Sequence, residues 1–345
     1  MDFPNPPKRC AACETNEDSR LLETHRDAIE GKDYRILSCP SCGVVFSEPR
    51  QAVGGEWYAA AAPLRLEAFS GDPESDRRFG RFLSEDITPG KLLDIGCGDG
   101  GFLALAQSRG WRVAGFDYDA RVARAAREKG LQDVSSEEFL TFMRRRPDEE
   151  FDAVTLFDVL EHTPEPLRFI EEVRRLLRPG GSLAVTLPNA LRPLPWGREA
   201  HDFPPHHFTR WTPEALKNFL ENNGFKVLRL EASELPVYYL AEHFFYYGLM
   251  RALLPPAKRF LFGRGGGGAT ISDLYKRSGK SSEDGIRAMM GDPRMRHRTA
   301  KLLKLLCVPL SYSVGALLTA YYLLTRPFCG EHLYVFARRE TAGDD

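Results

Sequence analysis

The sequence predicts an α/β protein whose core is a doubly wound parallel sheet. Between Lys91 and Leu230, short apolar runs alternate with segments of helical periodicity, as expected of consecutive strand–helix units. The first of these runs leads into a turn crowded with glycines. Because parallel strands share one direction, their carboxyl ends meet at one edge, where such sheets bind ligands.

The glycine-rich stretch KLLDIGCGDGGF, residues 91–102, predicts a strand, a tight turn and the start of a helix. Glycines let the backbone approach a ligand closely, and the first turn of a helix offers unpaired N–H groups. Gly96, Gly98 and Gly101 satisfy the dinucleotide fingerprint. Asp94, at the end of the strand, would repel a pyrophosphate and suits a ligand with an ammonium group. A turn that binds no ligand is the alternative.

DIGCGDG resembles motif I of the class I S-adenosylmethionine-dependent methyltransferases, and LLRPGGSLAVTLPN resembles their RPGG turn and fifth strand. The similarity runs over residues 91–189 and resumes over residues 206–230. It implies a Rossmann-like sheet of seven strands, in which the last strand runs antiparallel between the fifth and the sixth. FKVLRLEA and EHLYVFARRE would be the sixth and seventh strands. The resemblance also implies S-adenosylmethionine as cofactor and methyl transfer as activity.

A second carboxylate supports a nucleoside cofactor. Asp117 ends the second predicted strand, where a carboxylate can accept both ribose hydroxyls, in NAD as in S-adenosylmethionine. The resemblance places the adenine near Glu137, which with Ser136 is equally a helix cap. The cofactor contacts that we expect are Asp94, Gly96, Cys97, Gly98, Gly100, Asp117, Glu137, Phe157 and Asp158.

The chain offers several histidines as a base, the side chain best suited to proton transfer near neutral pH. The candidates are His162, His201, His206 and His207. The resemblance places His162 at the cofactor mouth, as in ubiquinone-type O-methyltransferases, and HDFPPHHFTRW over the acceptor. We expect His162, His206 and His207 to be catalytic, with packing roles as the alternative.

Several polar residues fall at the ends of predicted strands, and we interpret them as one site. They are Asp94, Asp117, Asp158, His162 and Asn189. By the same resemblance, Asp158, Glu161 and His162 match in outline a site for a second divalent metal, with Asp where that group of enzymes has Glu.

Two CxxC pairs near the amino terminus predict a zinc site. Cys10 and Cys13 form the first pair, and Cys39 and Cys42 form the second. Four thiolates close a tetrahedral site, which leaves zinc a structural or docking role. YRILSCPSCGVVF resembles a zinc ribbon, and metal binding would supply folding energy that this short polar segment lacks. Free thiols or a redox pair are the alternatives.

A helical insertion separates the last two predicted strands. Residues 237–254 predict an aromatic helix, a glycine-rich stretch begins at Arg264, and residues 305–325 carry no charge over a length that can span a bilayer. A span is the least favoured outcome, because both flanking strands join one sheet and Glu242 and Arg251 are costly in a membrane. We expect peripheral membrane contact, a lid over the acceptor pocket, or a soluble core or dimer helix.

Composition limits the remaining choices. The 345 residues suggest more than one unit, and a net charge of -1 gives no general attraction to nucleic acid. No charged-then-apolar leader opens the chain, so we expect a cytoplasmic protein, peripheral at most to the inner face of a membrane. The predicted units are a zinc-ribbon-like segment at 1–50, a linker and lid helix at 51–90, the cofactor-binding core at 91–231, the insertion at 232–330 and a final strand with tail at 331–345.

The predicted function is methyl transfer to a small-molecule, nucleotide-sugar or lipid-linked acceptor. An NAD-dependent nucleotide-sugar oxidoreductase and a non-catalytic zinc-ribbon interaction protein are the alternatives. Asp94 and the RPGG turn argue against the oxidoreductase. The oligomeric state and the target atom do not follow from the sequence.

Overall fold

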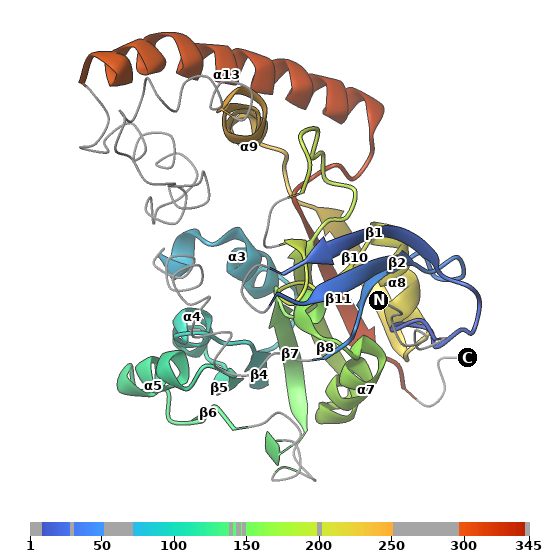
Figure 1. Ribbon diagram of the computed structural model, residues 1–345. Helices are drawn as coiled ribbons and strands as arrows, with labels where there is room; N and C mark the ends of the chain where they lie inside the picture. Colours follow the sequence, from blue (N-terminus) through green and yellow to red (C-terminus); the bar gives the residue numbers. More distant parts are fainter. Residues whose placement is uncertain are drawn as a thin grey trace.

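The computed structural model describes residues 9–27, 31–51, 72–137, 141–142, 146, 150–198, 202–250 and 297–341, and Figure 1 shows their arrangement. The described residues form two sheets, one of seven strands and one of four. A pair of helices lies at one end of the molecule, apart from both sheets (Figure 1). The predicted linker, the glycine-rich stretch after Arg264 and His201 lie almost entirely or wholly outside the described residues.

The larger sheet confirms the predicted Rossmann-like fold. Its strand order is β10-β11-β8-β7-β4-β5-β6. Strand β11 is antiparallel to both of its neighbours, and the other pairings are parallel. The strands are β4 (Lys91–Ile95), β5 (Arg112–Phe116), β6 (Val134–Ser135), β7 (Phe151–Phe157), β8 (Leu177–Pro188), β10 (Phe225–Ala232) and β11 (His332–Arg339).

Helices cover both faces of this sheet. Successive strand residues point to opposite faces, and apolar residues on each face pack against the helices there. Leu92 packs in one apolar cluster with Phe82 and Phe102, whereas Leu93 packs in another with Ile170. The first face is covered by α3 (Arg77–Leu83) and α4 (Gly101–Ser108), and the second by α7 (Pro166–Leu176) and α8 (Pro213–Glu221). Helix α5 (Ala120–Glu128) follows β5.

Side-chain caps mark the starts of α5 and α8, whereas β8 begins earlier than the sequence indicated. The side chains of Asp119 and Thr212 cap α5 and α8 by accepting hydrogen bonds from Arg121 N and Ala215 N. The RPGG segment was expected to be a turn, but it lies within β8, which begins at Leu177. Pairing of Phe151 with Leu177, ahead of a register shift, carries the strand through these residues.

The smaller sheet joins the amino-terminal segment to the core. Its order is β1-β2-β3-β9, with β1 (Arg20–Arg26), β2 (Asp33–Ser38) and β3 (Val45–Glu48) from the amino-terminal segment. The fourth strand, β9 (Thr209–Arg210), belongs to the segment that carries the paired histidines. The sequence indicated a zinc-ribbon-like segment around the second cysteine pair, but it did not predict the addition of β9.

The insertion forms a helical pair. Helix α9 (Val237–His243) continues into a π-helical turn, η4 (Phe244–Met250), and α13 spans His297–Thr325. Within the described residues, one segment, Cys307–Thr325, is long and apolar enough to cross a membrane, which by length and composition alone is weak evidence. Figure 1 shows α13 lying across the top of the molecule, with α9 beneath it.

Candidate functional site

The turn between β4 and α4 has the backbone of a ligand cradle. Gly96, Gly98 and Gly100 have φ of 81°, 53° and 79°, a region that favours glycine. A Cβ atom on Gly96 would also come within 2.5 Å of Cγ2 of Val159. Gly98 N donates a hydrogen bond of 3.0 Å to Oδ2 of Asp117, which fixes the turn against the end of β5. Backbone conformation therefore favours glycine at all three positions, and the lack of space favours it at Gly96 as well.

Two buried carboxylates lie beside this turn. Asp94 and Asp117 are each 3% exposed. Asp94 Oδ1 accepts a hydrogen bond of 2.6 Å from Oγ1 of Thr155. Burial raises the pKa of Asp94 to about 7, and the negative charge of Asp117 adds to the rise. A cationic ligand would offset both effects, so the site favours positive charge.

A cavity of about 240 Å³ opens between the glycine turn and α3. Four of the predicted cofactor residues line it, namely Asp94, Gly96, Cys97 and Phe157. The other five, which are Gly98, Gly100, Asp117, Glu137 and Asp158, are not part of its lining. Asp117 instead accepts a hydrogen bond from Gly98 N in the turn. Glu137 accepts a hydrogen bond of 3.1 Å from Ser135 Oγ.

Arg78 is a residue of this cavity that the sequence interpretation missed. It projects from α3, and its guanidinium group contacts the carboxylates of both Asp76 and Asp158. Asp158 adopts a φ of 56° at the end of β7. Burial works to raise the pKa of Asp158, but Arg78 outweighs it and the pKa falls below its ordinary value. An arginine in the first turn of the predicted lid helix was the available signal.

The predicted second metal group does not form. Arg78 and Oγ1 of Thr186 hold the carboxylate of Asp158, so it does not gather with Glu161 and His162. Among the described residues, the groups close enough to share a metal ion are the four amino-terminal cysteines and the three histidines. The carboxyl oxygens of Glu161 are buried with no hydrogen-bond partner in the described part of the chain. Burial raises the pKa of Glu161 well above its ordinary value.

The structure brings the three predicted histidines together. The nearest ring nitrogens of His162, His206 and His207 all lie within 4.8 Å of one another. Nδ1 of His162 lies 2.6 Å from the carbonyl oxygen of His206, so Nδ1 donates and Nε2 is the unprotonated nitrogen of the neutral ring. Nδ1 of His207 lies 3.8 Å from Oδ1 of Asp202, which is 2% exposed.

Buried arginines surround Asp202. Arg192 pairs with its carboxylate, and Arg210 Nε donates to its carbonyl oxygen over 3.3 Å. Burial, with the charge of Arg210, lowers the pKa of Arg198 to about 10. In the described part of the chain, Nη1 of Arg198 and Nη2 of Arg210 are buried without a hydrogen-bond partner. Among the described residues, buried guanidinium nitrogens without a hydrogen-bond partner therefore lie near Asp202.

Asn189 was interpreted as part of the site, but it is structural. Its side-chain Nδ2 donates to the carbonyl oxygens of Phe328 and Gly330, at 2.6 and 2.9 Å. Its Oδ1 accepts from Leu191 N at 2.9 Å. With 0% exposure, Asn189 ties the end of β8 to the chain that returns from α13.

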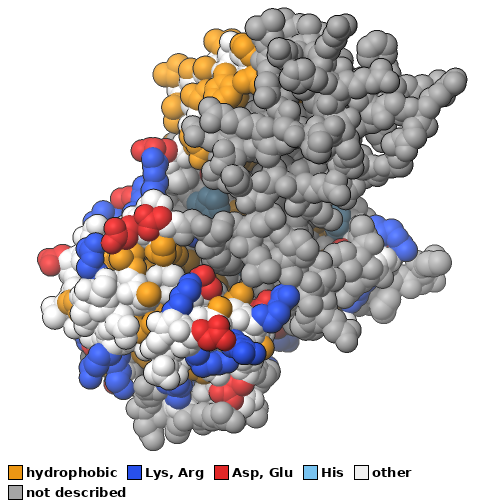
Figure 2. Space-filling view, turned by 90° about the vertical axis from the view of Figure 1, so that its left-hand side faces the viewer, with side chains coloured by type: hydrophobic (Ala, Val, Ile, Leu, Met, Phe, Trp, Pro, Cys, Tyr) orange, Lys and Arg blue, Asp and Glu red, His pale blue; other side chains and the backbone are white. Residues whose placement is uncertain are grey.

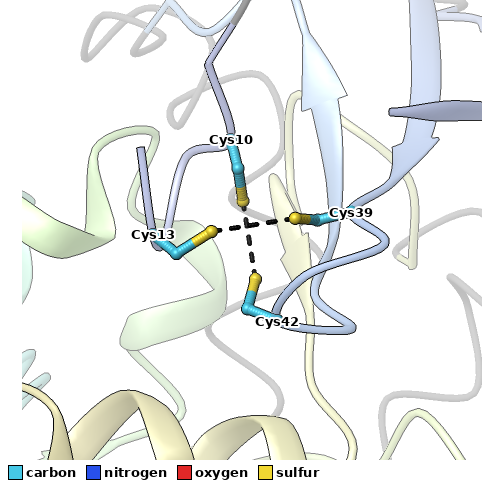
Figure 3. Close-up of side chains that lie close together, drawn as sticks. All are labelled: Cys10, Cys13, Cys39 and Cys42. Atoms are coloured by element: carbon cyan, nitrogen blue, oxygen red, sulfur yellow. Dashed lines mark hydrogen bonds between the residues drawn. The ribbon is translucent and has the colours of Figure 1, made fainter. Parts of the chain in front are cut away.

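The four amino-terminal cysteines converge on one point, as Figure 3 shows. The Sγ atoms of Cys10 and Cys42 lie 3.6 Å apart, and those of Cys13 and Cys39 lie 3.7 Å apart. A tetrahedron with zinc–sulfur bonds of ~2.3 Å has edges of roughly 3.8 Å. The spacing of the sulfur atoms therefore fits a tetrahedral metal ion.

The fold and the cavity define a Rossmann-like protein that binds a nucleoside cofactor carrying positive charge. A family profile described as a methyltransferase domain matches residues 72–230. A ubiquinone biosynthesis O-methyltransferase of Histophilus somni is 35% identical over 155 residues, covering 37% of this chain and 65% of that protein. A protein with the same description from Pasteurella multocida is 30% identical over 169 residues, covering 40% of this chain and 70% of the relative.

The chain belongs to the class I S-adenosylmethionine-dependent methyltransferases. A solved S-adenosylmethionine-dependent methyltransferase from Archaeoglobus fulgidus overlaps 80% of this chain and 98% of its own, with 18% identity and a TM-score of 0.46. The predicted family is thus confirmed on the sequence matches and on the sheet topology described above.

Proposed function

We propose that this protein transfers the methyl group of S-adenosylmethionine to a hydroxyl oxygen of a small, negatively charged acceptor. The observation that carries the proposal is the gathering of His162, His206 and His207 within 4.8 Å of one another, on segments that follow the parallel strands β7 and β8. A hydroxyl must lose a proton as it accepts a methyl group, and an imidazole is suited to take it. Relatives described as ubiquinone biosynthesis O-methyltransferases support oxygen as the target atom.

The residues around the cavity fit S-adenosylmethionine. Asp94 and Arg78 line the cavity, where Asp94 would bind the ammonium group and Arg78 the carboxylate of the methionine part. Asp117 is not part of the lining, and we propose it for the ribose hydroxyls from its place at the end of β5. When bound, the cofactor supplies a methyl group already activated by its sulfonium. The protein therefore has to orient the acceptor, exclude water and take one proton.

His162 is the best placed base. Its Nδ1 proton is donated to the His206 carbonyl, which directs the lone pair of the neutral ring to Nε2. The buried carboxyl of Glu161 lies 3.9 Å from this Nε2. Because burial and the charge of Asp158 raise the pKa of Glu161 well above its ordinary value, this carboxyl adds little negative charge that would hold a proton on His162.

The arginines beside the histidines indicate the charge of the acceptor. Arg192 pairs with the carboxylate of Asp202, whereas Arg210 contacts the carbonyl oxygen of Asp202 and, at 3.3 Å, the carboxylate of Glu23. Nη1 of Arg198 and Nη2 of Arg210 are buried with no hydrogen-bond partner among the described residues. A buried guanidinium group without a full set of partners is costly, and planar oxyanions pair with it well. We therefore propose that the acceptor carries a carboxylate or phosphate near the reacting hydroxyl.

We also propose that Cys10, Cys13, Cys39 and Cys42 hold a structural zinc ion. The sulfur spacing fits a tetrahedral site, and four cysteine ligands leave no position for substrate. The cluster packs with the core, since Cys10 and Cys39 share an apolar cluster with Trp211, next to β9. Zinc would thereby stabilise the strand that follows the paired histidines.

The proposal is tested by supplying S-adenosylmethionine with a panel of hydroxylated aromatic acids and sugar phosphates and detecting products by mass spectrometry. We expect an O-methyl product, and in His162→Gln a kcat lower by about 10²–10⁴-fold. Calorimetric binding of S-adenosylmethionine by His162→Gln should match the parent chain. Methylation at carbon or nitrogen, or full activity in His162→Gln, would overturn the proposal.

A further inference from the structure

Helix α13 buries small and polar residues and exposes leucines, which is the reverse of a helix that packs in water. Its buried positions, which recur every three or four residues, are Ser311, Gly315, Thr319 and Tyr322. Three leucines lie on the opposite side, where Leu310, Leu317 and Leu324 are 47%, 73% and 86% exposed, whereas Leu318 packs beside Tyr322 on the inner side. A helix that packs in water turns its leucines inward. This reversed pattern is typical of helices whose outer side meets lipid.

The contact between α13 and α9 uses small residues. A Cβ atom on Gly315 would lie 2.7 Å from Ala241 N and 2.8 Å from the carbonyl oxygen of Val237. The two backbones therefore touch, as they do where helices pack inside lipid and cannot use the hydrophobic effect. Ser311 Oγ donates to the Cys307 carbonyl oxygen at 2.7 Å, so its hydroxyl is satisfied within the helix.

The charged residues that flank the apolar segment of α13 in the sequence are all positive. In the sequence from Pro293 to Arg326 there are six lysines and arginines and no acidic residue. They flank Cys307–Thr325, which has no charged residue. Pairing of α13 with a second copy would bring like charges together, whereas anionic lipid head groups complement them. An anionic bilayer surface is therefore the partner that this face fits.

The helical pair stands at the edge of the sheet where the site lies. It leaves β10 and returns to β11 at the carboxyl end of the parallel strands. Trp196, on the loop after β8, packs on Phe244 with ring centroids 5.2 Å apart, and His243 Nε2 lies 3.1 Å from the Gly197 carbonyl oxygen. Figure 2 shows hydrophobic side chains gathered at the top of the molecule, where this pair lies.

We infer that α9 and α13 form a peripheral surface that rests on an anionic bilayer and brings the acceptor loop to an acceptor held at that bilayer. The inference depends on the proposed function for its substrate, which is then an anionic hydroxyl compound carried on a lipid. Leu310, Leu317 and Leu324 enter the interface, and the positive charge of the sequence on either side of Cys307–Thr325 favours anionic head groups.

Flotation with vesicles tests the inference on the full chain. We expect the protein to float with vesicles of phosphatidylcholine and phosphatidylglycerol in equal parts, and much less with phosphatidylcholine alone. The variant Leu317→Glu/Leu324→Glu should reduce the bound fraction roughly tenfold or more. Its matched control is Leu21→Glu/Leu22→Glu in β1, where the leucines are 49% and 42% exposed, and this variant should bind as the parent does.

Calorimetry with S-adenosylmethionine on the same samples separates the two proposals. Normal cofactor binding in a chain that does not float overturns the membrane inference and leaves the methyltransferase proposal standing. Flotation without cofactor binding supports the membrane inference and overturns the methyltransferase proposal. A dimer in light scattering that Leu317→Glu/Leu324→Glu dissociates, with no flotation of the parent, would assign the face to a second copy and overturn the inference.

Discussion

The affinity for S-adenosylmethionine should depend on pH through Asp94. Burial raises the pKa of this carboxyl to about 7, and only its ionised form attracts an ammonium group. With that pKa, the ionised fraction falls from about one half at pH 7 to about one hundredth at pH 5. The association constant should therefore fall roughly fiftyfold across this range, where the amino group of the cofactor stays protonated. Isothermal titration calorimetry at a series of pH values measures the slope.

Two variants separate Asp94 from other titrating groups. Asp94→Asn keeps an oxygen for the hydrogen bond from Thr155 but has no proton to lose, so its binding should be weak and flat between these pH values. Asp33→Asn removes a carboxylate that pairs with Arg26 at 3.0 Å in the smaller sheet, and it should keep the parent slope. An unchanged parent affinity at low pH, or a full slope in Asp94→Asn, would refute the reasoning.

The remaining predictions concern the turn, the cysteines and the core. Gly96→Ala forces a φ of 81° and a contact with Val159, so denaturant unfolding should show a loss of about 1–3 kcal/mol, whereas Gly43→Ala, with open space around it, should lose less. Mass spectrometry should find one zinc per chain, absent from Cys39→Ser and retained in Cys329→Ser; retention in Cys39→Ser would contradict the site. Trp211→Ala empties a position with 0% exposure, and urea unfolding should register a loss of about 3–5 kcal/mol; a loss below 1 kcal/mol would contradict its core role.

Short-range patterns carried most of the fold prediction. Apolar runs located the strands, and glycines and capping residues located the turns and helix starts, because these signals depend on neighbours in sequence. The family resemblance added the antiparallel last strand, which no local signal in EHLYVFARRE specifies. The cysteine spacing likewise anticipated the cluster that the structure forms.

Contacts between distant segments were beyond the reach of the sequence. Strand β9 pairs with β3 through Phe46 and Thr209, and a strand of two residues has no periodicity to detect. Beside it, Ser47 bonds to Phe208 across 161 residues. Arg78 meets Asp158 across 80 residues. Asn189 was wrongly interpreted as a site residue because it lies at a strand end. Its amide group instead bonds to backbone groups. Position at the correct edge is thus necessary for a functional role, but the partners of each side chain decide it.

The addition of β9 to the smaller sheet bears on how the catalytic part can be isolated. Phe208, only 2% exposed, fills a cluster with Tyr34 and Ile36, and its carbonyl oxygen accepts from Ser47 N at 2.9 Å. Cutting the chain at residue 72, where the family match begins, would expose the Phe208 ring to solvent. It would also leave β9 as an unpaired strand edge next to the histidines. Such a fragment should aggregate, so the methyltransferase core and its cysteine-bearing neighbour have to be produced as one piece.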